Sequence, residues 1–240
     1  MEAYNIFWFR RDLRLEDNSA LASALTEKEN VIPIFIFDAN IIDSLPKDDA
    51  RVSFIYNQLE KINNQLKEFK SSLIVKYGEP KEIFKQLLQD FDVEKVYSNK
   101  DYEPYAIKRD NDITSLLSQK NIHHIQFKDQ VIFEPHEVLK DNGEPYTVYT
   151  PYKNKWLSMF KQKSLEIIEK VNYDNFLKKS FSFPNLSDIG FIKSHIQVEN
   201  YRLNILDNYE KNRDSPSSDK TSYLSVHLRF GTVSIRRIIS

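Results

Sequence analysis

Hydroxyl side chains gather near the end of the sequence, in the run Thr221-Ser222-Tyr223-Leu224-Ser225. Hydroxyls and the free backbone N–H groups that open a helix can together bind an anion such as a cofactor diphosphate. An ordinary helix N-cap uses the same residue types, and spacing alone favours that interpretation. Upstream of this run, Arg213 could neutralise a phosphate or could form a solvated pair with Asp214.

Three charged loops form a second group of candidates, and each follows a short apolar run. They are residues 10–14 (RRDLR), 38–40 (DAN) and 99–103 (NKDYE). Parallel sheets bind ligands beyond the carboxyl ends of their strands, so a binding site is expected at these loops. For residues 10–18 we favour a structural interpretation, in which Asp12 pairs with an arginine and Asp17 caps a helix.

The apolar runs before these loops alternate with amphipathic helical patterns. Strands are predicted over Tyr4–Phe9, Val31–Phe37, Leu73–Tyr77, Val93–Ser98 and Ile122–Phe127. Helices are predicted from an Asp17 or Asn18 cap to Leu25, over Ala50–Phe69, from Pro80 to Phe91, and over Pro104–Gln119. This alternation predicts an α/β fold with a five-stranded parallel sheet that helices cover on both faces.

The alternation stops after Phe127, and the rest of the sequence differs in character. Residues 128–150 and 172–194 have no period and predict irregular structure, the second of them a linker that lies on a surface. Helices are predicted from Pro151, from His195 to Tyr209, and from a Ser234 N-cap. Because the last of these has less than two turns before Ser240, we expect the sequence to be the front part of a longer protein.

Composition excludes several classes of site. The sequence has no cysteine, which excludes disulfides, zinc–thiolate sites, iron–sulfur clusters and thiol catalysis. Its four glycines are too far apart for a glycine-rich dinucleotide fingerprint or a Walker A loop. His123 and His124 are neighbours in a predicted strand, so they point to opposite faces, and no metal site is predicted. Trp8 and Trp156 are interpreted as core residues.

Charge and hydropathy add weaker indications. The net charge is −1, yet residues 201–240 hold seven basic and four acidic residues, which mildly favours a polyanionic partner. The longest apolar run, Val31–Phe37, is far shorter than the roughly 20 residues that span a bilayer. The start of the sequence lacks the pattern of a signal peptide, so a cytoplasmic protein without membrane contact is expected.

Three blocks of the sequence, in the right order, resemble the DNA photolyase and cryptochrome family. They are Ile6–Asn18, the segment from Pro145 to Trp156, and the segment from Tyr209 to Gly231. The resemblance implies a Rossmann-like antenna domain over residues 1–128, an interdomain connector over 129–193, and the beginning of an all-helical FAD-binding domain over 194–240.

The family's cofactor and DNA contacts can be carried over to matching positions. The resemblance implies that the adenine-diphosphate side of FAD is lined by Tyr209, Thr221, Ser222, Leu224 and Ser225. It also implies a DNA phosphate contact for Arg213, while no catalytic residue is assigned within these 240 residues.

The antenna chromophore of the family lies at the ends of the strands. Glu103, Pro104 and Arg109-Asp110 resemble the helix that borders it, but Ala106 stands where folate-binding relatives have a glutamate. A deazaflavin or flavin is therefore favoured over a folate. The antenna candidates are Phe37, Asp38, Arg51, Asp101 and Arg109, for each of which a plain polar surface is the simpler interpretation.

The function that the resemblance implies is light-driven repair of pyrimidine dimers by electron transfer from reduced FAD, with damaged DNA as partner and a monomeric protein. A cryptochrome, which is a blue-light photoreceptor without repair activity, is the alternative, and a nucleotide-binding α/β module of unrelated chemistry is a third. Since the first domain has its own core, we expect it to fold alone. We expect residues after about Ser194 to be mobile or docked non-natively and not to retain FAD.

Overall fold

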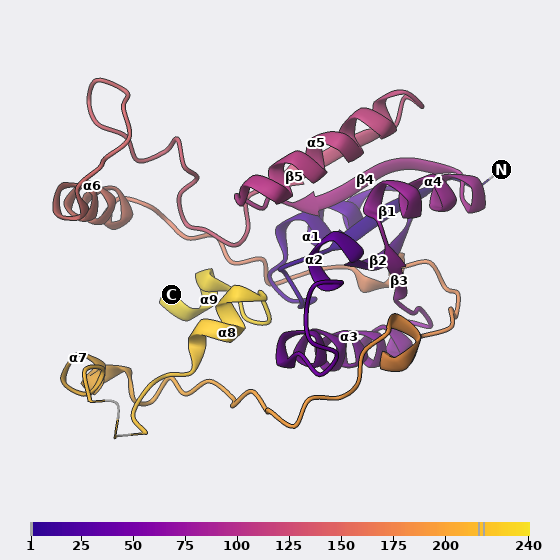
Figure 1. Ribbon diagram of the computed structural model, residues 1–240. Helices are drawn as coiled ribbons and strands as arrows, with labels where there is room; N and C mark the ends of the chain where they lie inside the picture. The colour runs from indigo at the N-terminus through magenta and orange to yellow at the C-terminus, as the bar shows by residue number, and fades with distance from the viewer. Residues whose placement is uncertain (1, 216, 218) are drawn as a thin grey trace.

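The computed structural model, which describes residues 2–215, 217 and 219–240, has a five-stranded parallel sheet at its centre (Figure 1). The strands are β1 (Tyr4–Phe9), β2 (Asn30–Asp38), β3 (Ile74–Gly78), β4 (Val93–Asn99) and β5 (His123–Phe127). Each predicted strand is confirmed to within one residue at each end. The order β3-β2-β1-β4-β5 reverses direction between β1 and β4, so the loops that follow these two strands border one crevice.

Helices cover both faces of this sheet, as predicted. One face carries α1 (Ser19–Thr26) and α3 (Ala50–Glu68), the other carries α4 (Pro80–Asp90) and α5 (Pro104–Ser118), and the short α2 (Ala39–Ile42) follows β2. Because side chains alternate along a strand, Phe7 and Phe9 pack with α1 and α3, whereas Ile6 and Trp8 pack with α4 and α5. The N-cap of α1 is Asn18, the second of the two predicted caps, and its side chain accepts from a backbone N–H within α1 at 3.2 Å.

Beyond β5 the chain leaves the sheet, forms α6 (Tyr149–Lys161) at the periphery, and returns through an irregular connector with two short 3-10 helices, η1 (Tyr173–Asn175) and η2 (Leu186–Ile189) (Figure 1). The connector is more than a surface linker. Phe176 is fully buried in the core beneath α1 and α3, and the Leu177 N–H donates to the Val31 carbonyl at 2.9 Å. The α/β domain therefore completes its core with residues from the connector.

The helix predicted from His195 to Tyr209 is wrong. This stretch is irregular until a 3-10 turn, η3 (Leu206–Asn208), which leads into the four-residue α7 (Tyr209–Asn212). Its polar backbone groups bond to distant partners, since the Arg202 N–H donates to the Ser222 carbonyl at 2.8 Å and the Glu199 carbonyl lies 2.9 Å from a ring nitrogen of His227. Tertiary contacts with the region of α8 (Leu224–Arg229) replace the local hydrogen bonds of a helix.

The segment that holds α8 and α9 (Ile235–Ile239) contacts the α/β domain through buried ion pairs. Arg236 lies 3.1 Å from Asp17 and 2.8 Å from Asp129, and Arg14 lies 2.5 Å from Asp129. We call Arg14, Asp17, Asp129 and Arg236 the interdomain ion cluster. Burial acts to raise the pKa of Asp129, but the two guanidinium groups outweigh it and hold that pKa below its ordinary value.

A glycine lets the same segment approach the loop after β1. Gly231 has a φ of +62°, and a Cβ at this position would lie 2.2 Å from the Arg11 carbonyl oxygen. Beside it, the Leu13 N–H donates to the Phe230 carbonyl at 3.1 Å. Any larger residue at 231 must push α8 and α9 away from the α/β domain.

Candidate functional site

A cavity of about 800 Å³ opens beyond the carboxyl ends of β1, β2 and β4, where the strand order predicts a ligand crevice. All five predicted antenna residues line it: Phe37, Asp38, Arg51, Asp101 and Arg109. These five residues come from the ends of β2 and β4 and from the helices α3 and α5, so segments that are far apart in the sequence meet in one place. The wall opposite the strands comes from α8, which contributes Ser225, Val226, Arg229 and Phe230.

Two arginines and an indole ring form one side of this cavity. The guanidinium carbons of Arg10 and Arg109 each lie 5.0 Å from the centre of the Trp8 ring, within the range of cation–π attraction. Both arginines pair with the single carboxylate of Asp110, so this group keeps one positive charge in excess. Behind it, burial and the neighbouring guanidinium of Arg10 lower the pKa of His124 to about 4, which keeps that ring neutral at pH 7.

Two buried donors on this side have no hydrogen-bond partner within the described residues. They are the indole Nε1 of Trp8 and the Nε of Arg10. Both atoms are buried beneath the cavity surface, so they stay unpaired within the described part of the chain, where most buried polar atoms have a partner.

A hydrogen-bonded pair forms another part of the wall. The Tyr105 hydroxyl donates to Asp38 Oδ2 at 2.7 Å, and the other oxygen of Asp38 accepts from the Asn40 N–H at 3.1 Å and so caps α2. Burial, followed by the neighbouring Asp38 carboxylate, raises the pKa of Tyr105 to about 12. The phenol therefore stays protonated at neutral pH, and it fixes the orientation of the Asp38 carboxylate.

The rim of the cavity is bridged by charged side chains from three elements. Glu103, the N-cap of α5, pairs with Arg11 at 3.0 Å and also with Arg229 of α8. Arg11 in turn donates from Nε to the Arg229 carbonyl at 3.1 Å. Arg229 is the main cause that lowers the pKa of Glu103. These contacts connect α8 to both loops of the crevice.

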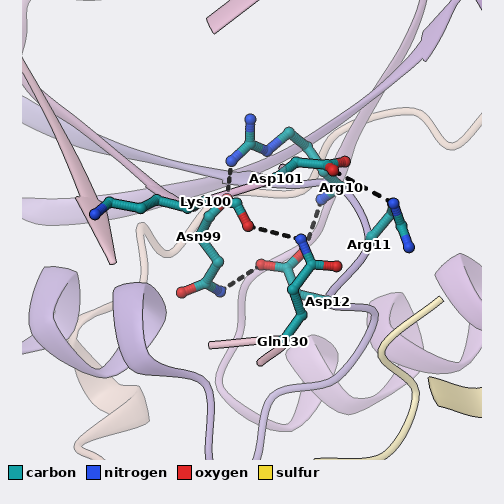
Figure 2. A pocket seen from close by; sticks show the side chains of 7 residues that line it. All are labelled: Arg10, Arg11, Asp12, Asn99, Lys100, Asp101 and Gln130. Carbon is teal, nitrogen blue, oxygen red and sulfur yellow. Dashed lines mark hydrogen bonds and ion pairs between the residues drawn. The ribbon is translucent and has the colours of Figure 1, made fainter. Parts of the chain in front are cut away.

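Below the rim lies a much smaller pocket, which is filled by the side chains that shape the loop after β1. Figure 2 shows the Asp12 carboxylate between the Arg10 backbone, which donates to it at 2.7 Å, and Asn99, which donates at 2.6 Å. Burial raises the pKa of Asp12. The structural interpretation of this loop holds, but its partners differ from the prediction. Asp12 bonds to a backbone N–H and an amide rather than to an arginine side chain, and Asp17 binds Arg236 instead of capping α1.

The predicted FAD residues are brought together only in part. Thr221, Ser222, Leu224 and Ser225 surround the start of α8, but its N-cap is Tyr223, which has a φ of +53° and makes no side-chain cap. The hydroxyls of Thr221 and Ser225 are on exposed residues, whereas Leu224 is buried. Tyr209 begins α7, which lies apart from α8 in Figure 1.

The structure assigns Ser225 to the wall of the large cavity, which the antenna candidates also line. Arg213 is exposed and lies 3.8 Å from Asp214, which is the arrangement of a solvated surface pair. The sequence already offered the Arg213–Asp214 pair as one interpretation, whereas the place of Ser225 depends on how α8 meets the α/β domain and had no local signal.

Sequence reasoning missed three contributors to the cavity. Trp8 is buried, as predicted for a core residue, but it also faces the cavity. Tyr105 directly follows the Glu103-Pro104 pair that marked the start of α5, so its place next to the predicted site was a usable signal. Arg229 comes from a distant part of the chain, and only the fold reveals it.

No group of three or more His, Asp or Glu side chains within the described part of the chain could hold a metal ion. Among the same residues, every helix is either too short or too polar to span a lipid bilayer.

Comparison with known proteins identifies the family. The DNA photolyase family model matches residues 5–170. A deoxyribodipyrimidine photo-lyase of Synechococcus sp. is 30% identical over 99% of this chain and 53% of its own length. An archaeal photolyase from Sulfolobus tokodaii, solved with two FAD molecules, has a TM-score of 0.74 and 28% identity over 98% of this chain and 53% of its own. For a bacterial class III photolyase from Agrobacterium tumefaciens the TM-score is 0.77 at 25% identity, over 99% of this chain and 52% of that one. The chain spans about half the length of these relatives, and it belongs to the DNA photolyase family.

Proposed function

We propose that the protein to which this chain belongs repairs pyrimidine dimers in DNA under blue light, by electron transfer from reduced FAD. We propose further that the cavity of the α/β domain holds a flavin-type antenna chromophore. One observation carries the proposal. All five residues that the sequence predicts for an antenna line this cavity, in a chain that belongs to the photolyase family.

The cavity has the size and chemistry for a flavin. A volume of about 800 Å³ lies within the roughly 300–1,000 Å³ of typical ligand pockets. Phe37 and Trp8 make part of the cavity wall apolar, and Asp38 offers an oriented acceptor for a ring N–H. The excess positive charge around Arg10 and Arg109 favours an electron-rich or anionic ligand.

Two observations favour a flavin over a folate. Ala106 lines the cavity at the position where the resemblance places a glutamate in folate-binding relatives, so this chain departs from the folate-binding pattern there. The Sulfolobus tokodaii relative was solved with two FAD molecules and described as implying a novel light-harvesting cofactor.

For the catalytic FAD, the hydroxyls at the start of α8 are the candidate phosphate ligands. Those of Thr221 and Ser225 are on exposed residues and make no hydrogen bond within the described residues, so they are free to bind. When bound, reduced FAD supplies the electron that splits the dimer, and this chain contributes binding and orientation. Arg213, on the exposed turn after α7, would contact a DNA phosphate.

The test uses the full-length protein, purified with its flavin. Illumination with blue light is expected to convert a dimer-containing oligonucleotide to the undamaged sequence, which chromatography measures directly. A flavin-loaded protein that leaves the dimer intact would refute the repair function and favour the cryptochrome alternative. The antenna is tested separately by the action spectrum, which is the repair rate measured as a function of wavelength. Light absorbed by a second flavin should contribute to this spectrum.

A further inference from the structure

Trp8 is one of the side chains in the cavity wall that can be oxidised easily. Among the described residues that line the cavity, one is a tryptophan, one is a tyrosine, and the other rings are phenylalanines. Trp8 is 1% exposed and packs edge-on against Phe84 at 5.0 Å between ring centres, so its place in the wall is fixed. A flavin that has absorbed blue light is a strong one-electron oxidant, and a nearby indole ring is an electron donor.

Electron transfer from Trp8 would dissipate the light that an antenna collects. One electron would leave the indole ring as the excited flavin gains it, which makes an indole radical cation beside a singly reduced flavin. Return of the electron restores both rings and releases the absorbed energy as heat. Excitation can pass to a second flavin only while the first one stays excited, so an antenna beside an indole needs an indole that is hard to oxidise.

Two cations lie against the Trp8 ring. The guanidinium carbons of Arg10 and Arg109 are each 5.0 Å from its centre. Both arginine side chains are 10% exposed or less, and both pair with Asp110, so one positive charge remains in excess where little water can screen it. This charge would repel a radical cation on the indole ring, which makes removal of an electron from Trp8 unfavourable.

The N–H group of Trp8 is also unsuited to oxidation. An oxidised indole is stabilised when its N–H passes the proton to a neighbouring acceptor. Trp8 Nε1 is buried and has no hydrogen-bond partner within the described part of the chain, so no acceptor for this proton is in place. Tyr105 differs, because its hydroxyl donates to Asp38 Oδ2 at 2.7 Å, and the guanidinium of Arg109 lies 6.0 Å from the centre of its ring.

We propose that Arg10 and Arg109 keep Trp8 reduced while the antenna flavin is excited, and so preserve the excited state for energy transfer. The inference rests on the proposed function, since the chromophore is the flavin proposed for this cavity. It gives the two arginines a role beyond attraction of a ligand. They act on the electron donor in the cavity wall, through the charge that they place against its ring.

Attraction of an anionic ligand is the simpler role for the same arginines. It predicts a lower affinity when Arg109 loses its charge, but it predicts no change in a flavin that is already bound. The fluorescence lifetime belongs to the bound flavin alone, because free flavin decays as a separate component. A lifetime measurement therefore distinguishes protection of the excited state from binding.

The experiment measures the fluorescence decay of FMN bound to the chain of residues 1–240, at FMN concentrations that saturate each variant. Arg109→Gln is expected to shorten the lifetime of bound FMN severalfold, and transient absorption should show an indole radical that forms as the fluorescence decays. Arg109→Lys keeps the charge and should retain most of the wild-type lifetime. The matched control is Lys108→Gln, which removes one charge from an exposed position of α5 outside the cavity lining and should leave the lifetime unchanged.

A change at Trp8 identifies the electron donor. Trp8→Phe in the Arg109→Gln background should restore the wild-type lifetime and abolish the radical signal. Because Trp8 belongs to the core, a second test leaves its size nearly unchanged. Fluorinated tryptophan, which is harder to oxidise, is incorporated at both tryptophans of the chain and should lengthen the shortened lifetime of Arg109→Gln.

Each outcome decides the inference. Equal shortening in Arg109→Gln and Arg109→Lys would overturn it, because packing rather than charge would then be responsible. Recovery by Tyr105→Phe instead of Trp8→Phe would assign the donor to Tyr105 and overturn the role of Trp8. A chain that does not bind FMN would refute the flavin antenna and the inference with it, whereas bound FMN with an equal lifetime in Arg109→Gln and wild type would refute the inference alone.

Discussion

The antenna cavity and the start of α8 are both candidate cofactor sites, and the chain builds them to different degrees. The cavity draws its walls from residues near positions 8, 37, 51, 101 and 109, which parallel strands and crossover helices bring to one edge of the sheet. The hydroxyls at 221–225 come from one short stretch, and two of the four FAD candidates there are exposed. The sheet side of the cavity therefore forms when the sheet folds, whereas its α8 wall and the motif at 221–225 both depend on how α8 packs against the α/β domain.

The interdomain ion cluster joins the segment that holds α8 and α9 to the α/β domain. Breaking this cluster is expected to have the largest effect on stability. Asp129→Asn leaves Arg14 and Arg236 without a full counter-charge in a buried place, and it should destabilise the folded state by about 3–5 kcal/mol. Urea unfolding measures the loss. Hydrogen exchange should show faster opening of 224–239 than of the sheet, and equal opening of both would mean that the cluster does not join the regions.

The same substitution should change the pH dependence of stability. The folded-state pKa of Asp129 lies below its ordinary value of 3.8, so the unfolded chain binds the proton more tightly. The contribution of the cluster is therefore fully present above about pH 4 to 5 and declines as the pH falls through the folded-state pKa. Wild type should lose more stability than Asp129→Asn between pH 5 and pH 2, and parallel curves would contradict this assignment.

A substitution at Gly231 should also weaken the packing of α8 and α9 against the α/β domain. Gly231→Ala places a Cβ against the Arg11 carbonyl oxygen, in addition to the strain of a positive φ, so a cost of about 2–4 kcal/mol is expected. Gly143→Ala is the matched control, because Gly143 also has a positive φ of +83° but no atom within 4 Å of the added Cβ. It should cost only about 1–2 kcal/mol. Similar losses for both variants, measured by urea unfolding, would show that close approach contributes nothing at 231.

Ligand binding distinguishes the antenna cavity from the candidate FAD site at the start of α8 most directly. Residues 1–240 should bind a flavin in the antenna cavity while retaining no FAD at the start of α8. Arg109→Gln removes one cation from the Trp8 ring and from Asp110, and flavin affinity should fall about tenfold, or about 1.4 kcal/mol. Fluorescence titration measures it, with Arg237→Gln, an exposed arginine of α9, as the control. Unchanged affinity in Arg109→Gln would remove this residue from the site.

The smallest effect is expected at the rim. Glu103→Gln weakens the pairs with Arg11 and Arg229, but Glu103 is about half exposed, and solvent screening limits the loss to about 0.5 kcal/mol. The dissociation rate of the flavin should rise about twofold at low salt and converge with wild type at 1 M salt. A difference that persists at high salt would mean that Glu103 acts through packing rather than through charge.

Sequence reasoning succeeded where the signal is local and periodic. The strand ends fall within one residue of the predictions, because buried parallel strands are short apolar runs with polar ends. Phe37, Asp38 and Asp101 among the antenna candidates lie at or near strand ends, which is where the sequence predicted a binding site, and their role in an antenna site stays a prediction. The helix predicted over 195–209 failed because backbone groups there bond to residues 222 and 227, and no local pattern contains such partners. Asp17 was misassigned for the same reason, as its partner is more than 200 residues away.

The interdomain ion cluster also bears on the order in which the chain folds during synthesis. Asp17, Asp129 and Arg14 belong to the part that leaves the ribosome first, and Arg236 follows Asp129 by 107 residues. At roughly 5–20 residues per second, the carboxylates of Asp17 and Asp129 have Arg14 as their only arginine of the cluster for about 5–20 seconds. Until Arg236 arrives, one of these negative charges lacks its partner, so the early domain is less stable than the finished one. Translation of the segment around α9 therefore acts as a late step that adds these ion pairs to a sheet whose last strand was made more than a hundred residues earlier.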